Sequence, residues 1–210
     1  MAKKHLVYKD RDGNPLPSVT TILQVLNKPK LTDWKLAVGK SRAESTVKAA
    51  AEFGTVVHSA IQSIVEDGQI PTFQDQRVST TIENLMKWIN NNVEEWVCME
   101  MAVYHQDLRY AGTFDGIVKL KSGKYALIDF KTSKSIHPDY YLQMCAYANA
   151  QEVEDDVFDL RNLDCGILVH LNHSTLMWEA VVVDVWDSQL KAVWLTLTQM
   201  YPWWKKHYDS

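Results

Sequence analysis

Two aspartates and one lysine lie close together in an otherwise apolar stretch of the chain. Asp115 belongs to one predicted strand, and Asp129 and Lys131 belong to the next. Two carboxylates beside an ammonium group suit phosphodiester hydrolysis, because Mg²⁺ prefers oxygen ligands and lowers the pKa of a bound water. The lysine can orient or deprotonate that water, or stabilise the developing charge. A surface hairpin held by an ion pair is the structural alternative.

The turn between the two strands decides whether these side chains meet. Ser122-Gly123-Lys124 is predicted to form a tight turn. If this turn has three residues, Asp115 lies opposite Lys131, and both share a face with Asp129. A two-residue turn shifts the register by one residue and moves Asp115 to the other face of the hairpin. Hydrolytic chemistry therefore requires a bulge or an odd-numbered loop here.

The composition is that of a globular protein, with an uneven charge distribution. The 210 residues are 46% hydrophobic and 23% charged, which is enough for one domain with a real core. The net charge is -4, yet residues 1–50 hold ten Lys or Arg against four Asp or Glu. A basic N-terminal part on an acidic body favours a polyanion bound along one side, with ordinary fluctuation of surface charge as the alternative.

Two classes of protein are disfavoured by the sequence. No apolar run is long enough to span a bilayer and the first residues do not form a signal peptide, so we expect a cytoplasmic protein without a membrane partner. The cysteines Cys98, Cys145 and Cys165 are far apart and set among apolar residues. They are expected to pack in the core rather than to bind zinc or an iron–sulfur cluster.

The N-terminal part is predicted to be a hairpin followed by helices. Residues 5–9 are expected to form a strand, and Ser18 to cap a first helix. Asp33 is expected to cap a second helix with Trp34 in its first turn, where the indole either stacks on a base or packs in the core. Basic and hydroxyl side chains nearby could meet phosphates. The candidate nucleic-acid contacts are Ser18, Thr20, Lys28, Lys30, Trp34 and Lys35, with Thr132 and Lys134 from the polar loop after Lys131.

The rest of the sequence predicts an α/β domain. Apolar residues follow helical spacing in some segments and alternate in others, and Pro202 should end or kink the last helix. Helices are predicted over residues 49–66, 78–89, 138–151 and 188–201, and strands over 97–104, 165–171 and 177–185 in addition to the hairpin. This order predicts a central mixed β-sheet flanked by helices. We expect a single domain over 1–210, with 1–48 as an extension of a 49–210 core.

Four further polar residues could complete a site, and each has a structural alternative. His58 lies on or beside the buried stripe of its helix, where it is either a satisfied core residue or reaches a neighbour past Gly54, one turn earlier. Glu100, within a predicted strand, faces either the metal site or solvent. Gln143 and Tyr147 are four residues apart and share a helix face, from which they could hydrogen-bond a substrate or a lysine.

Together these residues resemble the RecB-like branch of the PD-(D/E)XK nuclease superfamily. Five partial motifs occur in the family's order, namely Gly54-Thr-Val-Val-His58, Glu100, Gly112-Thr-Phe-Asp115, Asp129-Phe-Lys131 and Gln143-Met-Cys-Ala-Tyr147. Leu16 to Leu23 and Trp34 extend the likeness to the group of mitochondrial genome maintenance exonucleases and small phage exonucleases. The sequence lacks helicase motifs and the four cysteines that hold an iron–sulfur cluster in some RecB-like nucleases.

The resemblance implies a restriction-endonuclease-like core with a metal site for one or two Mg²⁺ or Mn²⁺ ions. It implies that Asp115 and Asp129 bind the metal and that His58 completes the metal shell. The backbone carbonyl of Phe130 is implied as an additional ligand. Glu100 is implied to support the site or to touch a second metal.

The resemblance also implies catalytic roles and a function. Lys131 is implied to position the attacking water, and Gln143 and Tyr147 to steady that lysine or the scissile strand. The expected function is a metal-dependent deoxyribonuclease of phage type, acting as an exonuclease on single-stranded DNA or DNA ends in replication, recombination or repair. Its expected partners are DNA and a phage recombination or replication protein, in the bacterial host cytoplasm. The alternatives are a structure-specific or restriction-type endonuclease, and an inactive nucleic-acid-binding protein with the same fold.

Overall fold

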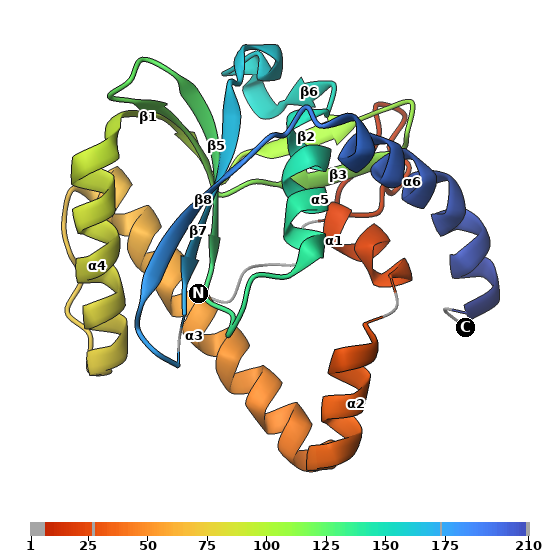
Figure 1. The fold of residues 1–210 in the computed structure, drawn as a ribbon. Coiled ribbons are helices and arrows are strands. Elements are labelled where there is room, and N and C mark those ends of the chain that lie inside the picture. Colours follow the sequence, from red (N-terminus) through yellow and green to blue (C-terminus); the bar gives the residue numbers. More distant parts are fainter. Residues whose placement is uncertain (1–6, 27, 173, 209–210) are drawn as a thin grey trace.

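The structure is a computed structural model that describes residues 7–26, 28–172 and 174–208, and for Lys30 the backbone alone. The predicted strand over residues 5–9 therefore lies partly outside the described residues. Its described end forms a single bridge from Lys9 to Pro15, which closes the N-terminal hairpin. The architecture is α/β, with a mixed central sheet flanked by helices and a helical N-terminal region, as predicted (Figure 1).

The central sheet places β5 in its middle. Its strands, in spatial order, are β1 (Val93–Met99), β4 (Gly116–Leu120), β5 (Tyr125–Lys131), β7 (Cys165–Leu171) and β8 (Trp178–Val183). β5 and β7 run parallel, and the other neighbours are antiparallel. A parallel pair needs a crossover, which α5 (Pro138–Ala148) supplies. Asp129 and Lys131 therefore lie at the end of a strand that is covered on both faces.

Side chains of β5 alternate between two hydrophobic cores. Leu127 packs into a core formed with α5 and α6 (Ser188–Tyr208). Ile128 and Phe130 pack into a second core formed with α3 (Lys40–Asp67) and α4 (Gln76–Asn92). Asp75 caps the first turn of α4. Strand alternation therefore directs Asp129 toward the α5 side of the sheet.

Two predicted strands are broken where they cross between sheets. β2 (Ala102–His105), β3 (Tyr110–Thr113) and β6 (Glu152–Val153) form a separate three-stranded sheet. The predicted strand over 97–104 breaks at Glu100, which has φ of 50°, and the strand that continues from β3 to β4 breaks before Gly116. The N–H of Glu100 donates to the carbonyl of Asp115 at 3.1 Å, which ties the two breaks together.

The hairpin loop has an odd number of residues, as the site requires, but it begins one residue earlier than predicted. Lys121–Gly123 form a three-residue loop, whose last residue has φ of 84°, a conformation that favours glycine. Gly116 pairs with Ile128, so the next position along the hairpin places Asp115 opposite Asp129, not opposite Lys131. The partner of Asp115 differs from the predicted one by two residues, so Asp115, Asp129 and Lys131 still share a face of the hairpin.

The N-terminal helices differ from the prediction in their start points. α1 (Val19–Ile22) is capped by Ser18 as predicted, and a 3₁₀ turn (Leu23–Val25) follows it. α2 (Pro29–Val38) starts at a proline that suits the first helical position, so Asp33 lies inside the helix and does not cap it. α3 begins at Lys40, nine residues before the predicted start at residue 49 and directly after α2, and the two helices form a V (Figure 1).

The last helix runs past its proline. α6 continues through Pro202 to Tyr208, so this proline does not end it. Within the described ranges, no helix combines the length and apolar character needed to cross a membrane.

Candidate active site

The central carboxylates are buried at the end of β5. Asp115 and Asp129 are 8% and 2% exposed. The ammonium Nζ of Lys131 lies 2.6 Å from Oδ2 of Asp129 and 5.0 Å from the ring centre of Tyr140. The N–H of Phe130 donates to Oδ2 of Asp115 at 2.7 Å, which fixes that carboxylate against the backbone of β5.

His58 reaches this cluster from α3. Its Nδ1 lies 3.3 Å from Oδ1 of Asp115, and its Nε2 lies 3.1 Å from the carbonyl oxygen of Phe130. A carbonyl only accepts, so this contact places a proton on Nε2 and leaves Nδ1 as the nitrogen that faces the carboxylate. The Phe130 carbonyl thus holds the imidazole, and the metal contact of this carbonyl that the resemblance implies stays a prediction.

Glu100 faces the same cluster rather than open solvent. Its carboxylate, a ring nitrogen of His58 and a carboxylate oxygen of Asp115 lie within 4.8 Å of one another, so they could share one metal ion. The positive φ of Glu100 is uncommon for a residue with a side chain, and strained conformations of this kind cluster at functional sites. The break between β1 and β2 is what points this side chain inward.

Burial and mutual charge shift the pKa values of Asp115, Asp129 and Lys131. Burial raises the pKa of Asp129 to about 6, with a further contribution from the charge of Asp115, although Lys131 opposes both. Burial also acts to raise the pKa of Asp115, but His58 and Lys131 outweigh it and hold that pKa below its usual range. The pKa of Lys131 is raised, because the two carboxylates outweigh the effect of burial.

The donor set fits a hard divalent cation. Oδ2 of Asp129 is buried and makes no well-directed hydrogen bond, even though it forms an ion pair with Lys131. Two buried carboxylates that repel each other, with Glu100 and His58 beside Asp115, gain from a cation between them. Carboxylate oxygens with one imidazole suit Mg²⁺ or Mn²⁺.

A cleft of about 860 Å³ opens onto the cluster. Asp115 and Glu100 lie in its wall, and α5 contributes Gln143 and Tyr147, whose side chains are joined by a 2.8 Å hydrogen bond from Nε2 to Oη. Of the candidate nucleic-acid contacts, Ser18 and Thr20 line this cleft.

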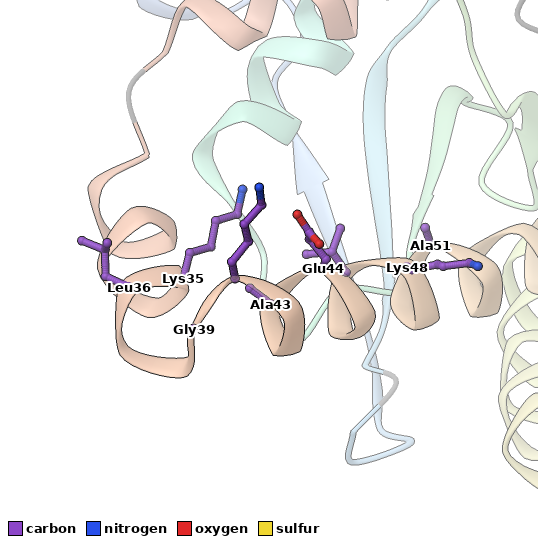
Figure 2. Close-up of a pocket in the computed structure, with 9 residues that line it drawn as sticks. Lys35, Leu36, Gly39, Ala43, Glu44, Lys48 and Ala51 are labelled. Carbon is purple, nitrogen blue, oxygen red and sulfur yellow. The ribbon is translucent and has the colours of Figure 1, made fainter.

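The other candidate contacts lie elsewhere. Lys28 pairs with Asp139 at 2.6 Å. Lys35 lines a separate hollow of about 710 Å³ between α2 and α3, and Figure 2 shows it pointing to the same side as Glu44. Trp34 is half-buried on α2 and belongs to neither hydrophobic core, while Lys30 lies in α2 with its side chain outside the description.

The loop after β5 carries the last two candidates. Thr132 is half-buried, and its Oγ1 would lie 3.0 Å from a Cβ placed on Gly54. The glycine of the first motif therefore makes room for this threonine rather than for His58. Lys134 is exposed, and its backbone carbonyl accepts from Asn172 at 2.8 Å.

The sequence motifs missed several residues around the cluster. Gln62, one turn after His58 on α3, lines the cleft, and that spacing could have revealed it. Tyr8 bonds Thr113 at 2.8 Å and also lines the cleft. His170 lies beside Lys131 on β7 and bonds the carbonyl of Ser133 at 2.7 Å, a contact that no local pattern could predict.

Gly112→Ala is expected to disturb the cleft wall and to lower both stability and activity. A Cβ at this position would lie 2.5 Å from Cε1 of Tyr147, whose ring is buried and bonded to Gln143. Displacing a packed ring of this kind costs about 1–3 kcal/mol. Chemical denaturation and a nuclease assay measure the two effects.

Gly123→Ala is the matched control for this change. A Cβ there meets nothing within 4 Å, but φ is 84°, so we expect lower stability and unchanged activity per folded molecule. Wild-type stability and activity in Gly112→Ala would contradict the close packing of Gly112 on Tyr147.

Comparisons with known proteins show what the whole chain is similar to. No protein-family model matches the chain. Among curated proteins, it is similar to mitochondrial genome maintenance exonuclease 1 from Mus musculus, with 30% identity over 171 residues. The match covers 74% of this chain and 49% of the relative, so the chain spans about half the length of that protein.

Among solved structures, the crystal structure of SSO0001 is similar to the chain. The TM-score is 0.45 and the sequence identity 15%, over 89% of this chain and 74% of the other. The chain is a distant homologue of mitochondrial genome maintenance exonuclease 1, which confirms the resemblance to the RecB-like PD-(D/E)XK nucleases that the sequence motifs indicated.

Proposed function

We propose that this chain is a single-domain, divalent-metal-dependent deoxyribonuclease that acts as an exonuclease on single-stranded DNA or DNA ends. The observation that carries the proposal is the convergence of five polar side chains from four separate segments, two of which, Glu100 and Asp115, line a cleft. These side chains are His58, Glu100, Asp115, Asp129 and Lys131. The similarity to mitochondrial genome maintenance exonuclease 1 supports the same chemistry.

The metal-binding roles follow from the donor atoms. His58, Glu100, Asp115 and Asp129 would hold Mg²⁺ or Mn²⁺, and the Phe130 carbonyl orients the imidazole. A bound ion of this kind polarises the phosphate and lowers the pKa of an attacking water. The contact between the Phe130 N–H and Asp115 keeps that carboxylate aimed at the site before substrate arrives.

Lys131, together with Gln143 and Tyr147 on α5, would contact the substrate. The ammonium of Lys131, held by Asp129, donates hydrogen bonds to the water or to the oxygen on which negative charge develops. Gln143 and Tyr147 line the cleft next to Asp115 and bond to each other. We therefore propose that Gln143 and Tyr147 steady the strand that is cut. The DNA is expected to be an intermediate of replication, recombination or repair, in a phage-type setting.

One assay separates this proposal from its alternatives. End-labelled linear single-stranded DNA and a closed circle of the same sequence are incubated with Mg²⁺ and with Mn²⁺. We expect the linear strand to be degraded and the circle to stay intact, because an exonuclease needs an end. Cleavage of the circle would favour a structure-specific or restriction-type endonuclease. No cleavage of either, together with no Mn²⁺ binding by calorimetry, would favour an inactive nucleic-acid-binding protein.

A further inference from the structure

The last turns of α6 reach the wall of the active-site cleft. Tyr201 and Lys205 line the same cleft as Asp115 and Glu100. They are four residues apart, so they share a helix face. Tyr201 is 6% exposed and stacks near Trp204, with ring centres 6.4 Å apart, which anchors this face on the body of the protein.

Lys205 supplies a positive charge where the cleft is otherwise acidic. Asp115, Glu100 and Glu154 all lie in the cleft wall. Among the described residues that line the cleft, Lys205 is the single Lys or Arg, and within the described ranges it forms no ion pair. An exposed ammonium there suits a backbone phosphate next to the scissile one, because a cation held by His58, Glu100 and Asp115 would neutralise only the phosphate being cut.

Exposed aromatic side chains follow one turn after this lysine, because Tyr208 is three residues beyond Lys205 and shares its side of the helix. Trp203 and Tyr208 are 58% and 67% exposed, and their ring centres lie 5.8 Å apart. The ring of His207 lies 4.9 Å from that of Trp203. Figure 1 shows this end of α6 at the edge of the molecule, beyond α1. Large aromatic faces next to cationic side chains are the usual platform for unpaired bases.

We propose that the last two turns of α6 form a subsite for a single-stranded segment of nucleic acid that continues out of the cleft. Lys205 binds a backbone phosphate in this subsite, and Trp203 with Tyr208 stacks on bases. Charge complementarity and continuity with the catalytic cleft both favour a nucleic-acid strand as the occupant. The inference rests on the proposed nuclease function and adds to it a site that no catalytic motif includes.

Two substrates separate the subsite from the catalytic centre. The first is a fluorescent single-stranded 20-mer, whose binding is measured with Ca²⁺ by anisotropy. The second is bis(p-nitrophenyl) phosphate, a small diester too short to reach α6, whose hydrolysis is measured with Mn²⁺. We expect Trp203→Ala and Lys205→Ala to weaken 20-mer binding by about tenfold each, as is usual for losing one stacking or phosphate contact. Hydrolysis of the small diester should be unchanged.

Two α6 variants serve as controls. Lys206→Ala removes the neighbouring charge, and Met200→Ala removes an exposed side chain, yet neither residue lines the cleft. Both should bind the 20-mer like the wild type. Wild-type binding by Trp203→Ala and Lys205→Ala would overturn the subsite, as would an equal loss in Lys206→Ala. Failure of the wild type to hydrolyse the small diester, together with no degradation of linear single-stranded DNA with Mg²⁺ or Mn²⁺, would instead overturn the nuclease function, while 20-mer binding would still report on α6.

Discussion

Lys131→Ala is expected to lower the rate of phosphodiester hydrolysis by about 10²–10³-fold, the usual cost of removing one preorganised donor from a developing charge. The ammonium lies 2.6 Å from Asp129 and is largely buried, so no neighbouring water can replace its geometry. Because we propose that the lysine acts on the reacting centre, kcat should fall while KM changes little. Single-turnover cleavage of a labelled single strand measures this effect.

The matched control for this prediction lies on the other strand of the same hairpin. Lys119 forms a surface ion pair with Glu94 at 3.1 Å, and exposed pairs contribute only about 0–1 kcal/mol to stability. Lys119→Ala should keep wild-type activity. Lys131→Gln keeps a hydrogen-bonding group beside Asp129, so it guards against a folding defect. Full activity in a folded Lys131→Gln variant would remove the lysine from the catalytic assignment.

Asp115→Asn is expected to weaken Mn²⁺ binding by at least about 100-fold, because even the loss of a group that supports a metal ligand costs 10–100-fold. The asparagine keeps the shape of the side chain and can still accept the N–H of Phe130. The change therefore isolates the charge of the ligand from its packing. Isothermal titration calorimetry with Mn²⁺ reports the affinity directly.

Asp164→Asn is the control for that titration. Asp164 accepts the N–H of Tyr125 at 2.9 Å, so it also ties a carboxylate to the backbone of β5, but at the opposite end of the strand. Its variant should bind Mn²⁺ like the wild type. Equal affinities in the Asp115→Asn variant and the wild type would show that the metal, if bound, lies elsewhere.

Local patterns in the sequence predicted the elements of the fold well. The cap at Ser18, the helix start at Pro138 and the α/β class all follow from side-chain chemistry over a few residues. The start of α3 was missed because residues 40–48 carry almost no buried side chain, so no apolar stripe marks them. The end of the last helix was missed as well, because α6 continues past Pro202, where the sequence predicted an end or a kink.

The sequence was least informative where the chain changes sheets. Alternation runs smoothly through Glu100, since both flanking segments are strands, and nothing local shows that they belong to different sheets. That break aims Glu100 at His58 and Asp115, with which it could share a metal ion. His170 and Lys205 depend on the parallel neighbour of β5 and on the path of α6, which are tertiary features with no local signal. The motif residues could be named in advance, but their assembly rests on long-range packing.

The most direct test of the metal centre is a crystal of the protein soaked with Mn²⁺, examined by anomalous diffraction at the manganese edge. We predict a peak bounded by His58, Glu100, Asp115 and Asp129, with ligand distances of about 2.0–2.3 Å, between those typical of Mg²⁺ and Ca²⁺. The Asp115→Asn crystal should lose this peak. A wild-type map with no peak at these side chains, or with its strongest peak elsewhere, would contradict the assignment of this cluster as the hydrolytic centre.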